Sequence, residues 1–468
     1  ARIVDRWKPI RRSDGLTGAS RKCGRTAEAQ AQTKGAIVAL RKRGDGQGRR
    51  KKLAARRDSH EGAPSRDEFA GRLMEAIRRA GETRPIRYDP DGFTLVSQKG
   101  EYHLRNAFRA YCLAKDRARM FRDAVAIWFA DMRLPEKYED VNPDLLPKVV
   151  RRTEYDASLP ERNGDGGEAR GTMPWLIGDH LAVVAAYDLP ECIAYLMPQN
   201  VAARWGVAYE KALRDAFANL LEISGEPFEN PQPGLYVSPW RDNHDASRLL
   251  LTDRIRRLDV KGDHVAMVPN RDTLLVTGSA DSAGLARMAE IAAAALDEPY
   301  WVSALPVRLT DGGWVRFMPD AEHPSFQHYK SLRTRSIGAD YGEQQETLKR
   351  LFELDDADIL VSSYFVGEKR ATRGYVSYCV WTDGLTQVLP QTDVVAFMFP
   401  DKPGERCAVA ADWDSVFSTM AEAMTPVGSY PERYRVSQSP TPDQLSAMGA
   451  RDVTEYLSGL RAPGDWGT

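Results

Sequence analysis

The sequence has few cysteines, and they form no pattern that binds zinc or builds a disulfide framework. Its 468 residues include 5 cysteines without a Cys-x-x-Cys pair, at Cys23, Cys112, Cys192, Cys379 and Cys407. Scattered cysteines in odd number are typical of small apolar core residues in a reduced protein. We therefore predict a cytoplasmic protein that holds no metal ion.

Long apolar runs are also missing. A transmembrane helix needs about 20 apolar residues, and the core of a signal peptide needs about 7–15. The longest candidate near the N-terminus, Gly35 to Leu40, is shorter than both, and no apolar stretch follows Arg11-Arg12 as a twin-arginine export signal requires. No membrane association is expected.

The motifs of common catalytic chemistries are absent as well. The sequence has no GxxxxGK[S/T] phosphate loop, no dinucleotide-binding GxGxxG and no HExxH pair. Ser279 follows Gly278 but lacks the second glycine of a GxSxG nucleophile turn, and His323 and His328 flank Pro324 in an expected loop. These absences predict no cofactor and favour a protein that is not an enzyme.

The net charge of −1 conceals a strong asymmetry between the beginning of the chain and the rest. Residues 1–62 contain 18 Lys and Arg against 6 Asp and Glu, so they carry +12 and the remainder carries −13. This arm lacks hydrophobic periodicity and predicts a disordered basic segment. It could contact nucleic acid, which is expected only through residues 1–62, or have no function of its own, or come from a start site placed too far upstream.

Patterns of apolar and turn residues predict an α+β fold of two or three mixed modules with antiparallel or mixed sheets. In the first module, Ser65 and Glu68 match a capping box, a helix follows to Gly81, a three-stranded meander spans 86–104, and one helix spans 106–132. The predicted divisions are a basic arm at 1–62, a helix-meander-helix module at 63–135, a linker or excursion at 136–172, a central α+β domain at 173–320, a connector at 321–342 and a C-terminal α+β module at 343–468.

The central module is predicted to alternate helices with buried strands. Helices are expected at 201–221, 245–258 and 282–296, because apolar residues recur there at helical spacing. Strands are expected at 181–187, 235–237, 265–268, 273–277 and 302–307, followed by a hairpin around Asp311-Gly312-Gly313.

The best candidate for a site is the polar loop Trp240-Arg-Asp-Asn-His-Asp245. Asp242, His244 and Asp245 are close enough in sequence to form a histidine–carboxylate pair. Arg271, beside Asp272 at a strand end, could clamp an anion bidentately. The structural alternative is favoured: Asp245 caps the following helix and Arg271 forms an ion pair with a nearby aspartate.

The C-terminal module contains a strand that is apolar on both faces, Val376 to Trp381. Such a strand must be covered on both sides, either inside the protein or by a partner. Because Tyr and Trp are typical anchors of protein interfaces, Tyr375, Tyr378 and Trp381 are candidate residues for binding a protein partner.

Residues 66–319 resemble an uncharacterised bacterial family typified by the YtpQ protein. The segments that carry the resemblance are Tyr187-Asp-Leu-Pro190, Trp205-Gly-Val207, Asp245-Ala-Ser247 and Val268-Pro-Asn-Arg-Asp272 with the strand after it. The resemblance implies an intracellular α+β protein and supplies no catalytic residues.

Together these patterns predict a non-catalytic interaction or regulatory protein that binds a protein partner. The first alternative is a hydrolase-like enzyme, or a binder of an anionic small molecule, that uses Asp242, His244, Asp245 and Arg271. The second alternative is nucleic-acid association through the basic arm.

Overall fold

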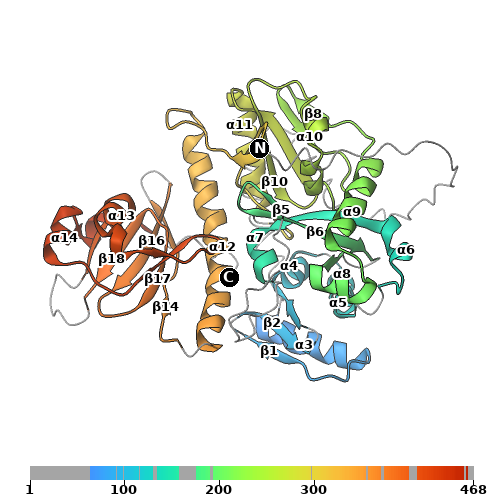
Figure 1. Cartoon of the computed structure of the whole chain (residues 1–468), viewed down its shortest axis with the longest axis horizontal. Helices are drawn as coiled ribbons and strands as arrows, with labels where there is room; N and C mark the ends of the chain where they lie inside the picture. Colours follow the sequence, from blue (N-terminus) through green and yellow to red (C-terminus); the bar gives the residue numbers. More distant parts are fainter. Residues whose placement is uncertain are drawn as a thin grey trace. The chain divides into compact units, whose positions relative to one another are not determined.

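The computed structural model shows an α+β protein (Figure 1). The predicted basic arm, 1–62, lies outside the residues that the structure describes. No helix within the described part of the chain is both long and apolar enough to cross a membrane. The described residues are 64–90, 92–98, 100–114, 116–129, 134–157, 175–189, 193–296, 298–354, 357–369, 374–399, 408–457 and 460–461.

The described residues fall into two compact units, and the first contains α3 to α5. Helix α3 (Arg66–Arg79) begins at the predicted capping box, in which Ser65 Oγ accepts from Glu68 N and the Glu68 carboxylate accepts from Ser65 N. It is followed by the meander β1 (Arg87–Asp89), β2 (Thr94–Ser97) and β3 (Gly100–His103). Helices α4 (Arg105–Leu113) and α5 (Arg117–Trp128) complete this unit, whose core is rich in aromatic side chains around Phe69.

The prediction of one helix at 106–132 is wrong, because two helices occupy this stretch. Helix α4 ends at Leu113, and Asp116 starts α5, since its side chain accepts a hydrogen bond from Arg119 N at 2.9 Å. An aspartate at this position satisfies a free backbone N–H of a new helix, which an uninterrupted helix would not need.

The second unit is built around a six-stranded antiparallel sheet in the order β13-β12-β10-β11-β9-β8. Side chains of β10 alternate between two cores: Val265 and Met267 pack under helix α11, and Ala266 and Val268 face the opposite core. The elements are β8 (Glu229–Gln232), β9 (Leu235–Val237), β10 (His264–Asn270), β11 (Thr273–Gly278), α11 (Ser282–Ala295), β12 (Val307–Thr310) and β13 (Gly313–Arg316). The hairpin predicted around Asp311-Gly312-Gly313 is confirmed, whereas the strand predicted at 302–307 begins only at Val307.

A second sheet packs on the free face of the first one. Strand β6 (Leu181–Asp188) lies between β4 (Leu145–Arg151) and β5 (Trp175–Ile177), and its Leu181 and Val183 share a core with Ala266 and Val268 of β10. The stretch 136–172 was predicted to be a linker or excursion, and its described part forms regular elements. It contains β4 as well as α6 (Tyr138–Val141), η3 (Asn142–Asp144) and α7 (Arg152–Ala157). Strand β4 is held by pairing with β6, a contact that local sequence patterns do not reveal.

The helices of this region are shorter than predicted. The stretch 201–221 divides into α8 (Pro198–Trp205) and α9 (Tyr209–Ile223), because Gly206 ends α8 in the left-handed region with φ of 63°. The helix predicted at 245–258 is instead a 3₁₀ turn η4 (Ala246–Leu250) followed by the single turn α10 (Thr252–Ile255). Strand β7 (Ile193–Leu196) precedes α8.

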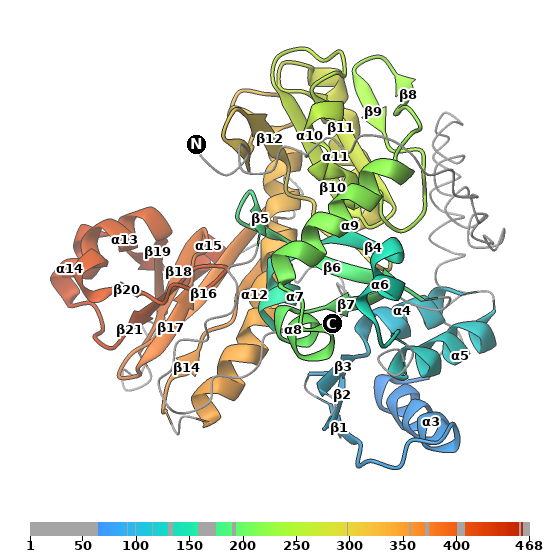
Figure 2. The same cartoon turned by 45° about the vertical axis from the view of Figure 1, so that its right-hand side comes forward.

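The C-terminal part begins with α12 (Phe326–Leu354), a helix of 29 residues that contacts α7 and α11 as well as β14, β15 and β16 (Figures 1 and 2). The prediction of a connector at 321–342 is wrong, because α12 occupies most of this stretch. Tyr329 and Leu332 on α12 are buried against α11, and this tertiary packing stabilises a helix whose own sequence is not strongly amphipathic.

Two sheets follow α12 and enclose one core. The first has the order β14-β17-β21-β20 and the second β22-β19-β18-β16-β15-β23. Trp381 and Phe397 from the second sheet meet Leu389 from the first, and Trp413 and Val416 of α13 close this core. The strands are β14 (Leu360–Val361), β15 (Phe365–Lys369), β16 (Tyr375–Thr382), β17 (Gln387–Pro390), β18 (Val394–Met398), β19 (Ala408–Asp412), β20 (Thr425–Pro426), β21 (Arg433–Val436), β22 (Arg451–Asp452) and β23 (Leu460–Arg461), and the helices are α13 (Trp413–Met420), η5 (Ala421–Ala423), α14 (Pro442–Ala447) and α15 (Val453–Leu457).

Candidate functional site

The predicted polar loop lies between β9 and η4, and its own side chains hold it in shape. Asp242 N donates to Asp245 Oδ2 at 3.2 Å, and His244 N donates to Asp242 Oδ1 at 3.0 Å. Arg241 and Asn243 have positive φ values of 53° and 69°, a conformation that costs free energy in residues other than glycine. The surrounding contacts must therefore stabilise this loop.

Asp242 forms the strongest of these contacts, with Arg248 on η4. Arg248 Nη1 and Nη2 donate to the two carboxylate oxygens at 2.8 and 2.7 Å, and Nε donates to Ser224 Oγ at 2.8 Å. The Arg248 guanidinium also lies 4.1 Å from the centre of the Trp240 ring, and the side chain is fully buried. Burial alone would raise the pKa of Asp242, but the hydrogen bonds and charge of Arg248 hold that pKa below its usual value.

His244 pairs with Asp188, a residue that the sequence analysis did not select. Its Nε2 lies 3.0 and 3.1 Å from the two carboxylate oxygens of Asp188, at the end of β6, and its side chain is 1% exposed. Its Nδ1 has no hydrogen-bond partner within the described structure. A histidine–aspartate pair is the arrangement of a general base, but a ring this buried does not reach a dissolved substrate.

Asp245 does not cap η4, so the predicted capping role is wrong. No side-chain hydrogen bond caps this turn, and the Asp245 carboxylate instead accepts from the backbone of Asp242. Burial and the nearby charge of Asp242 raise the pKa of Asp245 to about 6. Ser247 on η4 accepts from Val149 N on β4 at 3.2 Å.

Lys148 on β4 enters the same region from a segment that was predicted to be a linker. It is 2% exposed, and its Nζ donates to the carbonyl oxygen of Asn243. Burial and repulsion from Arg271 lower the pKa of Lys148 to about 8, whereas the charges of Asp272, Asp188 and Asp242 oppose this shift. Lys148 therefore supplies a positive charge near Asp242 of the loop and Asp188 of β6.

Arg271 lies at the turn between β10 and β11 and pairs with its neighbour, as the structural alternative predicted. Its Nε is 3.7 Å from Asp272 Oδ2, and its guanidinium lies 3.6 Å from the centre of the Tyr300 ring. Its carbonyl oxygen accepts from Ala246 N at 3.1 Å, which ties the turn to η4. The four predicted residues thus belong to one group, which we name the central polar cluster: Lys148, Asp188, Asp242, His244, Asp245, Arg248 and Arg271.

Within the central polar cluster, most charges are compensated by a neighbour of opposite charge. Arg248 neutralises Asp242, His244 contacts Asp188, and Arg271 contacts Asp272. In the described part of the chain, no group of three His, Cys, Asp or Glu residues is arranged to hold a metal ion. The arrangement braces β4, β6, η4 and the β10–β11 turn against one another.

Another buried network joins α7 to α12. Arg151 Nη1 lies 2.7 Å from Glu343 and 3.7 Å from Asp340, and Thr153 Oγ1 donates to both carboxylates at 3.0 and 3.3 Å, respectively. Tyr430 donates to the other oxygen of Asp340 at 3.2 Å. Burial raises the pKa of Asp340 to about 7, an effect that Arg151 opposes and Glu343 reinforces.

The three aromatic residues predicted to contact a partner lie in different environments. Trp381 is 1% exposed and packs against Phe397 in the core between the two C-terminal sheets, so it is not available to a partner. Tyr375 lies on that same strand face, near its end, and is half-buried. Tyr378 points to the opposite face and stacks on Phe365 with 5.1 Å between ring centres.

That opposite face of the sheet is only partly covered. Helix α15 covers Val376, Val394 and Ala410 with its Val453 and Tyr456. Phe365 on β15 is 41% exposed, and Met398 at the end of β18 is 45% exposed. Strand alternation and register place them on one face with Tyr378 and Val380, and we name these four residues the open sheet face.

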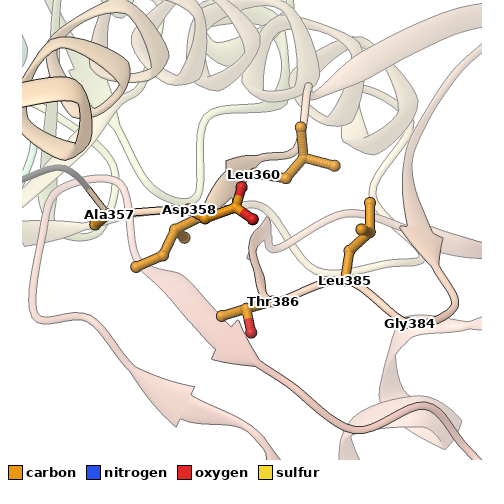
Figure 3. A pocket seen from close by; sticks show the side chains of 7 residues that line it. Ala357, Asp358, Leu360, Gly384, Leu385 and Thr386 are labelled. Atoms are coloured by element: carbon orange, nitrogen blue, oxygen red, sulfur yellow. The ribbon is translucent and has the colours of Figure 1, made fainter.

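A hollow of about 450 Å³ lies elsewhere in the C-terminal part, between residues 357–360 and 384–386 (Figure 3). It is remote in sequence from every residue of the central polar cluster. Its walls belong to the segment that joins α12 to β14 and to the turn that leads into β17.

Comparisons with protein-family models, curated proteins and solved structures give no match to this chain. The resemblance of residues 66–319 to the YtpQ-like family therefore stays a prediction. Sequence analysis missed Lys148, Asp188 and Arg248. The available signals were a lysine within the apolar run Leu145 to Val150, an aspartate at the end of a buried strand, and an arginine directly before the apolar run Leu249 to Leu251.

Proposed function

We propose that this protein is a non-catalytic interaction protein that binds a protein partner through the open sheet face. The observation that carries the proposal is the exposure of Phe365, stacked on Tyr378, and of Met398, two strands away on the same sheet face. Apolar side chains clustered on one face are typical of interaction surfaces, whereas isolated exposed ones are common on any protein. A stacked aromatic pair is rigid and loses little entropy on binding.

The central polar cluster also favours a non-catalytic function, because its charged side chains already bind one another. Arg248 is fully buried and engaged by Asp242, Ser224 and Trp240, so a substrate would have to displace existing contacts. The two described cysteines, Cys112 and Cys379, are buried free thiols, which agrees with a cytoplasmic protein.

The test compares partner capture by the wild-type chain, Phe365→Glu and Val427→Glu under chemical cross-linking and mass spectrometry. Val427 is 38% exposed in the same C-terminal part, so it receives the same new charge at a site outside the open sheet face. We expect a partner that the wild type and Val427→Glu capture equally and that Phe365→Glu captures about tenfold less, as for loss of an interface hot spot. Equal capture by all three chains would contradict the proposal.

A second candidate function is hydrolase-like chemistry or binding of a small anion at the central polar cluster. The observation that favours it is a buried lysine with a pKa of about 8 near the His244–Asp188 pair, since perturbed groups gather at functional sites. Thermal denaturation with inorganic phosphate, pyrophosphate and citrate at constant ionic strength tests it. A rise in Tm that Arg271→Gln abolishes and Arg254→Gln preserves would support this function, and no rise with the wild type would oppose it.

A further inference from the structure

The hollow between residues 357–360 and 384–386 has one exposed leucine on each side. Leu360 is 45% and Leu385 44% exposed, although both are large apolar side chains. Figure 3 shows the carboxylate of Asp358 beside Leu360, with Leu385 and Thr386 across the hollow. A volume of about 450 Å³ is enough for one long side chain and the peptide groups around it.

Backbone and side-chain hydrogen bonds hold both walls in place. Leu360 N donates to Thr386 O at 3.0 Å, and Leu360 and Val361 pair in parallel with Gln387 and Val388. The turn before β17 is fixed by Gln387, whose Nε2 donates to Thr382 O at 2.9 Å. The hollow is therefore preformed, and a ligand would not have to order it.

The charged residues of the two described segments that form it are acidic. Residues 357–360 and 382–387 include Asp358 and Asp383 and contain no Lys or Arg. Asp358 is exposed and has no ion pair within the part of the chain that the structure describes. The terminal carbonyls of α12 add partial negative charge just before this segment, so these carboxylates raise the local electrostatic energy.

We propose that this hollow binds a basic peptide segment of a partner protein by enclosing one arginine or lysine side chain. The aliphatic stem lies between Leu360 and Leu385, and the cationic head pairs with Asp358. Long basic side chains combine an apolar stem with a charged end, which matches this combination of walls and carboxylate. The cation also offsets the partial negative charge of the last carbonyls of α12.

Charge argues against nucleic acid, because a phosphate backbone would meet the carboxylates of Asp358 and Asp383 and no Lys or Arg in either segment. Asp358 is the one carboxylate among the described lining residues, which argues against a bare metal ion, since such an ion needs several oxygen ligands. In a peptide segment with alternating basic and apolar residues, the apolar groups can contact Leu360 and Leu385 and a basic group can pair with Asp358. The proposal depends on the proposed function only in assigning protein binding to the C-terminal part, since the hollow and the open sheet face share no residue.

The test is fluorescence anisotropy of the full chain with a labelled peptide of alternating arginine and leucine residues. A matched peptide carries citrulline, the neutral analogue, in place of every arginine. We expect binding of the arginine peptide to weaken about tenfold in Asp358→Lys and about threefold in Leu385→Ser. Raising the salt from about 50 to about 300 mM should weaken it further, because part of the attraction is between exposed charges.

Asp443→Lys is the control, since Asp443 is exposed in the same C-terminal part and undergoes the same change of charge. Equal losses in Asp358→Lys and Asp443→Lys would show unspecific attraction and overturn the proposal. Equal affinity for the citrulline peptide, or no binding by the wild type, would overturn it as well. Urea unfolding of each variant confirms that the chain is folded.

The same titration with Phe365→Glu separates this proposal from the proposed function. We expect Phe365→Glu to bind the arginine peptide like the wild type. If the peptide fails to bind while partner capture still depends on Phe365, the hollow is excluded and the open sheet face is retained.

Discussion

The central polar cluster and the open sheet face lie in the same unit of the chain and differ in what their side chains leave unsatisfied. In the cluster, most charged groups are matched by an opposite charge: Arg248 is fully buried and binds both oxygens of Asp242. On the open sheet face, Phe365 and Met398 remain exposed with only part of the face under α15. Residue types that suggest catalysis can therefore serve to stabilise a fold. Strands without such residues can present the exposed apolar side chains that a binding surface needs.

A substitution of Asp242 tests most directly whether the central polar cluster stabilises the fold. Asp242→Ala leaves Arg248 buried without its partner, so we expect the free energy of unfolding to fall by about 3–5 kcal/mol. Urea denaturation measures this loss. Asp253→Ala, at an exposed acidic residue of α10, should change it by about 0.5 kcal/mol or less.

The double variant Asp242→Leu with Arg248→Met sharpens the same test. It removes both charges together and should recover much of the loss, because an uncompensated buried charge is the main cost. If Asp242→Ala resembles the exposed control, the cluster does not brace the loop.

The network between α7 and α12 should make stability depend on pH. The pKa of Asp340 is raised to about 7, so the folded chain holds this proton more tightly than the unfolded chain. Its contribution is therefore full below about pH 4 and is lost as the pH rises towards 7, by about 2–4 kcal/mol in total.

Asp340→Asn cannot titrate and keeps an oxygen that can accept from Thr153 or Tyr430. We expect its unfolding free energy to fall less than that of the wild type between about pH 5 and pH 7.5, when both are measured in urea. Identical pH profiles would show that Asp340 does not retain its proton in the folded state.

Lys148 should produce the opposite trend at higher pH. Its pKa is lowered to about 8, so between about pH 8 and 10.5 the unfolded chain binds the proton that the folded chain has lost. Stability relative to Lys148→Met should rise across this window by about 2–3 kcal/mol. Thermal or urea unfolding of both chains at pH values of about 7.5 and 10 measures the difference, and a constant difference would exclude the lowered pKa.

The smallest effect is expected on the open sheet face. Phe365→Ser removes one exposed ring and its stacking on Tyr378, so we expect a loss of about 1 kcal/mol or less. Trp381→Ala, on the covered face of the same sheet, should cost about 3–5 kcal/mol. Similar losses in urea denaturation would mean that Phe365 belongs to the core and not to an interaction surface.

Some elements could be predicted because local chemistry alone specifies them. The capping box at Ser65 and Glu68 starts α3, and Asp311-Gly312-Gly313 forms the turn between β12 and β13. In each case, the residues that form the structure are neighbours in sequence, so nothing distant has to be known.

The candidate site could be predicted only in part. The polar loop and Arg271 were found because their polar residues interrupt apolar patterns. Lys148, Asp188 and Arg248 were missed, since each belongs to a run that is otherwise apolar. The capping role of Asp245 failed because a 3₁₀ turn replaced the expected helix and its carboxylate bonded within the loop instead.

The sequence by itself determined the α+β class, the first helix and meander, and the buried strands of the central module, because short-range periodicity and turn residues encode them. Tertiary structure alone decided that β4 is a strand, that α12 is one long helix, and that Asn243, His244 and Asp242 of the loop meet partners from β4, β6 and η4, respectively. The physical reason is that strand pairing, helix packing and charge compensation depend on residues far apart in the chain, whose proximity only the folded backbone creates.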